Sequence, residues 1–213
     1  MKNSIFLISV ALILSAFNSQ AQGQNSDNRD KLSLGIKGGL NFSNIYDTEG
    51  EDFEADGKIG FVGGLFLAIP IGKYLGVQPE MLYSQKGFKS SGKFLGTNYE
   101  MKRTTSFIDV PILLQVKPVE ILTIVAGPQY SFMLTRKDEF TGGSLTATDE
   151  EKFDNDDLRN NIFGFIGGAD LNLQNLVIGA RVGWDLQNNY KDEPSTKPRY
   201  RNVWYQATIG FRF

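Results

Sequence analysis

Apolar and polar residues alternate along most of the chain, as they do in a β-strand whose two faces meet different environments. Between Leu32 and Phe42, apolar residues alternate with Ser33, Lys37 and Asn41. The same two-residue period returns in seven later segments. The pattern therefore predicts eight strands, at 32–42, 61–69, 75–86, 108–117, 122–135, 160–173, 176–187 and 202–213.

The connections between these segments alternate in length, which indicates how the strands are joined. Long stretches at 43–57, 88–98, 136–160 and 187–200 alternate with short turns at 70–73, at 118–120 and around 174–175. Outer-membrane barrels have this asymmetry, with long loops outside the cell and tight turns in the periplasm. We therefore expect an all-β fold, an eight-stranded antiparallel up-and-down transmembrane β-barrel with long extracellular loops and short periplasmic turns.

The first residues have the composition of an export signal. Lys2 precedes an apolar run from Ile5 to Phe17, and Ser19-Gln20-Ala21 places small residues where a signal peptidase cleaves. The run is too short for a membrane-spanning helix, and the chain has no Cys to carry a lipid anchor. We expect a signal peptide at 1–21, a short linker at 22–30 and a barrel domain at 31–213, located in the outer membrane.

Charged residues occur on the polar face of the predicted strands. If that face lines a narrow lumen, acids and bases must pair there, because an unpaired charge in such an interior is costly. The sequence thus predicts a charge network in the lumen, formed by Lys37, Glu80, Asp109, Asp170, Arg181, Asp185 and Arg212.

Aromatic residues near the predicted strand ends indicate girdles at the two membrane interfaces. Ten Tyr and Trp residues fit this position: Tyr46, Tyr74, Tyr83, Tyr99, Tyr130, Trp184, Tyr190, Tyr200, Trp204 and Tyr205. The last strand ends on Phe213, in phase with Tyr205, Ala207, Ile209 and Phe211. We interpret Phe213 as an assembly signal, which makes the barrel assembly machinery an expected partner.

Composition excludes several kinds of chemistry. The chain of 213 residues has no His and no Cys, so a Ser-His-Asp triad, a thiol nucleophile and a zinc site of His or Cys are all excluded. Its formal net charge of −2, without dense clusters of Lys and Arg, argues against nucleic-acid binding. We expect no enzymatic activity and no cofactor.

Several ordered motifs resemble the PorT-like outer-membrane β-barrel family of Bacteroidetes, often labelled the porin family. They are LGIKGGLNFS at 34–43, GFVGG at 60–64, VQPEMLYS at 77–84 with QKG at 85–87, IDVPILL at 108–114, AGPQY at 126–130 and GFRF at 210–213. The resemblance extends from about Leu32 to Phe213. It implies an eight-stranded outer-membrane barrel, and it brings no catalytic residues with it.

Two expected loops are rich in carboxylates. Residues 47–56 contain six acids and no base, and 138–157 contain eight acids with Lys152 as the base. Grouped carboxylates bind Ca²⁺ or Mg²⁺, although neither stretch has the spacing of an EF-hand loop. The alternative is a solvated loop without a ligand. Weak divalent-cation binding is therefore one expectation, next to contacts with outer-membrane lipid and lipopolysaccharide.

Three functions fit these observations. Eight strands leave an interior that side chains can fill, which favours a non-enzymatic barrel serving envelope structure or surface interaction through its loops. A narrow porin-like channel for solutes or ions is the first alternative. The second is a soluble periplasmic barrel of the lipocalin type that binds an apolar ligand, since alternation alone does not say which face is outside.

Overall fold

The structure, a computed structural model, describes residues 28–47, 56–94, 97–142, 145–152, 161–188 and 200–213. The predicted signal peptide and most of the predicted linker lie outside these ranges. The elements are η2 (Asn28–Asp30), β1 (Ser33–Asp47), β2 (Asp56–Pro70), β3 (Leu75–Phe94), β4 (Thr97–Val119), β5 (Leu122–Gly142), β6 (Leu145–Lys152), β7 (Asn161–Leu173), β8 (Leu176–Asp185) and β9 (Tyr200–Arg212).

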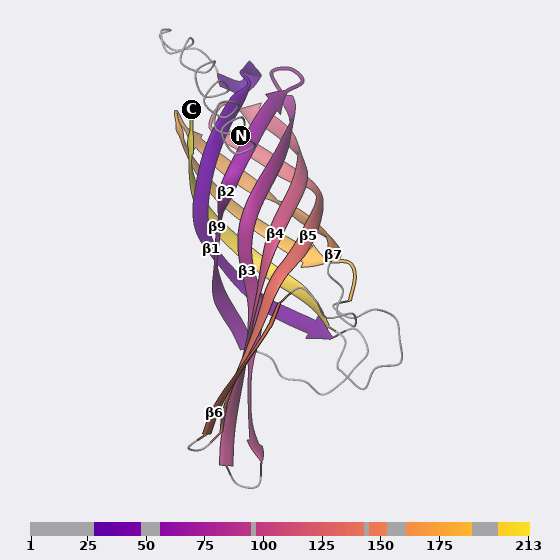
Figure 1. Ribbon diagram of the computed structural model, residues 1–213. Coiled ribbons are helices and arrows are strands. Elements are labelled where there is room, and N and C mark those ends of the chain that lie inside the picture. The colour runs from indigo at the N-terminus through magenta and orange to yellow at the C-terminus, as the bar shows by residue number, and fades with distance from the viewer. Residues whose placement is uncertain (1–27, 48–55, 95–96, 143–144, 153–160, 189–199) are drawn as a thin grey trace, which may run out of the picture.

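Eight of the strands close into a ring, as the alternation predicts. The order around the ring is β1-β2-β3-β4-β5-β7-β8-β9, and β9 returns to pair with β1. Every pairing is antiparallel, and the strands tilt around a common axis (Figure 1). The all-β, up-and-down barrel is thereby confirmed.

The barrel places its apolar residues outside and its polar residues inside. Outward residues such as Phe61, Ile209 and Met81 are 60% to 66% exposed. The intervening inward positions hold buried Asn41, Gln129 and other polar side chains. This arrangement suits a hydrocarbon surround and is the reverse of a water-soluble barrel.

Strands continue well past the barrel at one end, where the sequence predicts loops. β3 reaches Phe94 and β4 begins at Thr97, so the predicted loop at 88–98 is almost wholly strand. The predicted loop at 136–160 contains the end of β5 and the additional strand β6, which pairs with β5 outside the ring. These loop boundaries are wrong, because backbone pairing continues in water without the apolar face that marks a membrane strand.

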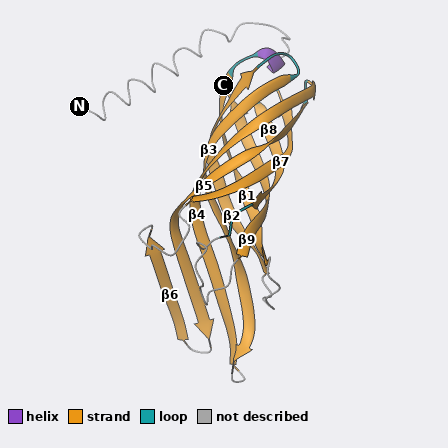
Figure 2. Cartoon of the chain, turned by 90° about the vertical axis from the view of Figure 1, so that its right-hand side faces the viewer, coloured by secondary structure: helices purple, strands orange, loops and turns teal. Residues whose placement is uncertain are grey.

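The extended parts of β3, β4 and β5 and the whole of β6 form a four-stranded sheet, which we call the protruding sheet. It projects from the end of the barrel opposite to the C-terminus and η2 (Figure 1, Figure 2). The short turns after β2, β4 and β7 join strands at the C-terminal end. The barrel ends therefore differ as predicted, although strands rather than loops form much of the longer end.

No helix within the described ranges has the length and apolar character needed to cross a bilayer.

Candidate functional site

The lumen is the candidate site, because the predicted charged residues point into it. Six of them, Lys37, Glu80, Asp109, Asp170, Arg181 and Asp185, are at most 8% exposed, and Arg212 is less buried. The seven residues come from six different strands of the ring, and the alternation of each strand turns them inward. Some of them, however, pair with residues outside the predicted group of seven.

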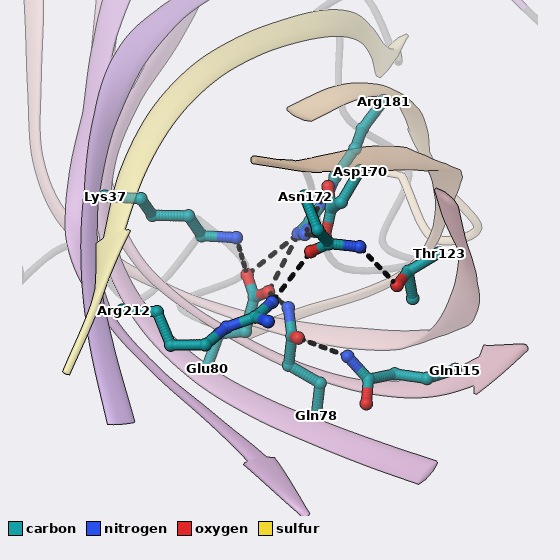
Figure 3. Close-up of polar contacts among 9 residues, drawn as sticks. All are labelled: Lys37, Gln78, Glu80, Gln115, Thr123, Asp170, Asn172, Arg181 and Arg212. Atoms are coloured by element: carbon teal, nitrogen blue, oxygen red, sulfur yellow. Dashed lines mark hydrogen bonds and ion pairs between the residues drawn. The ribbon is translucent and has the colours of Figure 1, made fainter. Parts of the chain in front are cut away.

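Four of the seven residues form one cluster, which we call the Glu80 cluster. Arg181 donates to both carboxylate oxygens of Glu80 at 2.9 Å and to the Asp170 carboxylate at 2.9 Å. Lys37 forms an ion pair with the same Glu80 carboxylate, at Oε2 (Figure 3). Glu80 on β3 and Arg181 on β8 stand on opposite sides of the eight-strand ring. The cluster therefore crosses the lumen and ties facing walls together.

Neutral polar side chains extend the Glu80 cluster in two directions. Gln78 donates to Glu80 at 2.6 Å and in turn accepts a hydrogen bond from Gln115. On the other side, Arg212 donates to Asn172 at 2.8 Å, and Asn172 donates to Thr123 at 2.9 Å (Figure 3). Arg212 thus contacts an amide, where the sequence predicts an acid as its partner.

A second ion pair lies nearer the protruding sheet and involves a lysine that the sequence prediction leaves out. Lys86 is 1% exposed and forms an ion pair with Asp109 at 3.0 Å. Its ammonium group also lies 3.8 Å from the centre of the Trp204 ring and 4.9 Å from that of Phe107. Lys86 lies on the polar face of β3 in the alternating sequence pattern. This pattern could therefore have identified Lys86 as a residue of the lumen.

Asp185 lies in the lumen beside an amide side chain. It is 2% exposed, and the backbone amide and side-chain amide of Asn202 both donate to it. The two residues lie on β8 and β9, which are neighbours in the ring. The structure thus brings Asp185 into the lumen without adding it to the Glu80 cluster.

An apolar layer also crosses the lumen. Leu113, Val125, Ile166 and Trp204 form one cluster of side chains that are at most 1% exposed. Leu113 on β4 and Trp204 on β9 come from opposite sides of the ring, so the layer spans its width. The girdle prediction is wrong for Trp204, because its position on β9 has the inward phase. Tyr74, Tyr83, Tyr130 and Tyr205 are exposed, as a girdle requires.

The protruding sheet has its own ion pairs, which involve residues expected in an acidic loop. Arg103 and Arg136 both pair with Asp138, at 2.7 and 2.8 Å. Lys102 and Lys137 both pair with Glu139, at 3.1 and 2.7 Å. Burial alone would raise the pKa of Asp138, but hydrogen bonds from both arginines hold the pKa below its ordinary value. These two acids are therefore neutralised by neighbouring strands.

Within the described ranges, no three acidic side chains come close enough to hold a metal ion. Residues 48–55 of the first acidic stretch and 153–160 of the second lie outside those ranges, so cation binding there stays a prediction.

Phe213 is half exposed at the C-terminal end, and its backbone amide donates to the Leu34 carbonyl at 2.8 Å.

Comparisons with solved structures return small outer-membrane barrels. Ail of Yersinia pestis is 14% identical, covers 85% of this chain and 98% of its own, and gives a TM-score of 0.46. Neisserial surface protein A is 11% identical, with coverage of 86% and 99% and a TM-score of 0.49. OprG of Pseudomonas aeruginosa is 12% identical, with coverage of 89% and 99% and a TM-score of 0.42. No curated protein matches the chain.

The family comparison covers most of the sequence. Residues 20–191 match the outer membrane protein beta-barrel domain, which includes β1 to β8 and therefore seven of the eight strands of the ring. With apolar residues outside and polar residues inside, the chain belongs to this outer membrane protein β-barrel family, and its barrel lies in the lipid bilayer of the outer membrane.

Proposed function

We propose that the protein is a non-enzymatic barrel with a sealed lumen, which holds the protruding sheet at the cell surface for interaction or envelope structure. The observation that carries this proposal is the apolar layer of Leu113, Val125, Ile166 and Trp204, which joins opposite walls of the ring. An ion entering this layer would exchange much of its water for apolar side chains, and this exchange is costly. The proposal therefore ranks above a narrow channel.

The polar parts of the lumen support the same conclusion. Glu80, Lys37, Arg181 and Asp170 satisfy one another directly across the lumen, so their charges do not line an open path. A soluble barrel that binds an apolar ligand would need the opposite orientation, with apolar residues inside, and that alternative is wrong. The lack of His and Cys still argues against the usual hydrolytic chemistry.

Three finer proposals rest on the sequence. The aromatic end at Phe213 supports recognition by the barrel assembly machinery, and the acids at 47–56 support weak divalent-cation binding. The motifs between Leu32 and Phe213 support a place in the PorT-like branch. None of the three is needed for the sealed lumen.

Conductance in planar lipid bilayers tests the sealed lumen. We expect no stable single-channel currents from the wild-type protein, and we expect currents when Leu113→Ala and Trp204→Ala together open the apolar layer. Ile209→Ala, on the outer face of β9, serves as the control and should stay silent. Steady unitary currents from the folded wild-type protein would favour the channel instead.

Shortening the protruding sheet tests whether it is separable from the barrel. A variant in which a tight turn replaces residues 91–100 should still enter the outer membrane and still migrate differently with and without boiling on an SDS gel. Failure of this variant to form a barrel would assign the sheet to folding rather than to surface interaction.

A further inference from the structure

A small cavity lies inside the barrel beside the Glu80 cluster. Its volume is about 10 Å³, which is room for one particle of about the size of a water molecule. Charged, polar and apolar side chains share its wall, among them Lys37, Asp170, Arg181, Thr208, Phe66 and Val177. A space of this size admits a water molecule or a monatomic ion, and it excludes polyatomic anions such as phosphate.

The cavity lies near the end of the barrel that has the short turns. Each residue of its wall is within five positions of a strand end on that side. Arg181, for example, follows the first residue of β8 by five positions, and Thr208 precedes the last residue of β9 by four. The short turns of outer-membrane barrels face the periplasm, so a periplasmic ion reaches the cavity without passing along the whole lumen.

More bases than acids point inward at this end of the barrel. The Glu80 cluster contains two bases and two acids. Arg212 at the end of β9 and Lys117 near the end of β4 add two bases, and they donate to uncharged groups, the Asn172 side chain and the Arg29 carbonyl. Among the described strand residues that face inward at this end, no third acid offsets them. An excess of buried positive charge is costly unless an anion neutralises it.

Hydrogen-bond donors are also in excess at the cavity. The buried Nε of Arg181 has no acceptor among the described residues, and Lys37 has three N–H groups with Glu80 as its ion-pair partner. The carboxylates, in contrast, are occupied, since both oxygens of Glu80 and both of Asp170 accept from Arg181. A water molecule here would need acceptors for its own two hydrogens, whereas an anion accepts from every donor and donates none.

We propose that the cavity binds one chloride ion from the periplasm, held by the Lys37 ammonium group, the Arg181 Nε–H group and the Thr208 hydroxyl. The ion neutralises part of the excess positive charge and gives the unused donors an acceptor. It thereby joins β1, β8 and β9 near the periplasmic end. The site goes beyond the sealed lumen and does not depend on it, because a conducting barrel could hold the same ion.

X-ray diffraction at long wavelength identifies the occupant, because chloride then scatters anomalously and water does not. Crystals of the full-length folded protein grown in sodium chloride should show an anomalous peak in the cavity, within hydrogen-bonding distance of Lys37 Nζ and Arg181 Nε. Electron density without an anomalous signal would identify a water molecule and overturn the proposal. An empty cavity would overturn it as well.

Urea-induced unfolding from lipid vesicles measures chloride binding without a crystal. Sodium chloride replaces sodium gluconate at constant ionic strength, and the gluconate anion is too large for the cavity. Because the site exists in the folded state alone, the folding equilibrium constant should rise at least about threefold between about 10 mM and about 1 M chloride.

Matched variants separate the cavity from a general salt effect. Val177→Ile adds a methyl group to the cavity wall and leaves every charge in place, so the chloride response should disappear. Val116→Ile adds the same group on the outer face of β4 and should respond like the wild type. Lys37→Met removes one excess charge and one donor, and it should also lose the response. If the gel shift shows that Lys37→Met does not form the barrel, Val177→Ile carries the comparison.

Two outcomes of the unfolding experiment overturn the proposal. One is a wild-type protein whose stability does not rise with chloride. The other is an equal rise in the wild type and in Val177→Ile, which would assign the effect to the surface rather than to the cavity. An anomalous peak in the cavity, together with a chloride response that Val177→Ile abolishes and Val116→Ile retains, supports the proposal.

Discussion

The lumen and the protruding sheet use the same ionic arrangement in different surroundings. In the lumen, Glu80 forms ion pairs with Lys37 and Arg181, and its side chain is 0% exposed. In the sheet, Asp138 forms ion pairs with Arg103 and Arg136, and its side chain is 23% exposed. Each acid thus holds two bases, but the first triad crosses a closed interior whereas the second lies along neighbouring strands in contact with water.

The difference indicates what each arrangement contributes. Removing one member of a buried group leaves an uncompensated charge where water cannot reach it, so the cost is large. Removing one member of an exposed group lets water and salt replace it, so the cost is small. The lumen pairs accordingly fix how the walls face one another, whereas the sheet pairs mainly favour one register and keep the surface charged.

The largest effect is expected from Glu80→Gln. The variant keeps the shape of the side chain but leaves Lys37 and Arg181 with Asp170 as the only acid of the cluster, which should lower the free energy of unfolding by about 3–5 kcal/mol. Urea-induced unfolding from lipid vesicles, followed by Trp fluorescence, measures the loss.

A second variant tests whether the loss comes from charge imbalance. Lys37→Met combined with Glu80→Gln leaves the Arg181–Asp170 pair with no net charge, so the double variant should regain more than half of the lost stability. If Glu80→Gln costs no more than Asp138→Asn, the contrast between lumen and sheet is wrong.

Asp138→Asn is expected to have a smaller effect, limited to the protruding sheet. The arginines Arg103 and Arg136 lose a partly exposed partner, so local opening of β4 and β5 should become easier by about 1 kcal/mol or less. Hydrogen exchange of the backbone amides measures this opening, and amides in the membrane part of the same strands provide the internal reference.

The pH dependence of the sheet follows from the pKa of Asp138. Its pKa in the folded sheet lies below the ordinary value of about 3.9. The contribution of this carboxylate to stability is therefore complete above that ordinary value, and it is lost as the pH falls through the lower folded value. The protection factors of amides in β4 and β5, which correct for the slower intrinsic exchange at low pH, should fall below about pH 4 in the wild type. Asp138→Asn should show no such fall.

The smallest effect is expected from Glu139→Gln. Its two partners, Lys102 and Lys137, have side chains that are 40% and 44% exposed, so water replaces the lost contacts. Amide exchange in β4 and β5 should match the wild type at high salt, where these pairs are screened. If Glu139→Gln destabilised the sheet as much as Asp138→Asn does, exposure would not explain the difference between the ion pairs of these two acids.

The alternation of residues was enough to assign the face of each predicted lumen residue but not its partner. Lys37 and Glu80 lie on one face by phase, whereas the bond between Glu80 and Arg181 joins residues 101 positions apart. Asp109 has the inward phase as well, yet its partner is Lys86 rather than one of the predicted bases. Partner choice depends on height and position around the ring, which strand register and tilt decide.

The protruding sheet shows where sequence pattern has least power. The sequence of β6, LTATDEEK, has no sustained alternation of apolar residues, so the period that reveals a membrane strand is absent. Trp204 shows the converse difficulty. An aromatic residue near a strand end suggests a girdle, but Trp204 shares the phase of Asn202 and Gln206 on β9, and this phase turns it into the lumen.

The sequence by itself determined the barrel, its eight membrane strands and the face of each residue, because a two-residue period is a local property of an extended chain. The tertiary structure decided which inward residues meet across the lumen and that apolar side chains from opposite walls also meet there. It also decided that strands continue beyond the membrane and bring Arg103 and Arg136 to Asp138. These are contacts between distant segments, and only closure of the ring with a fixed register specifies them.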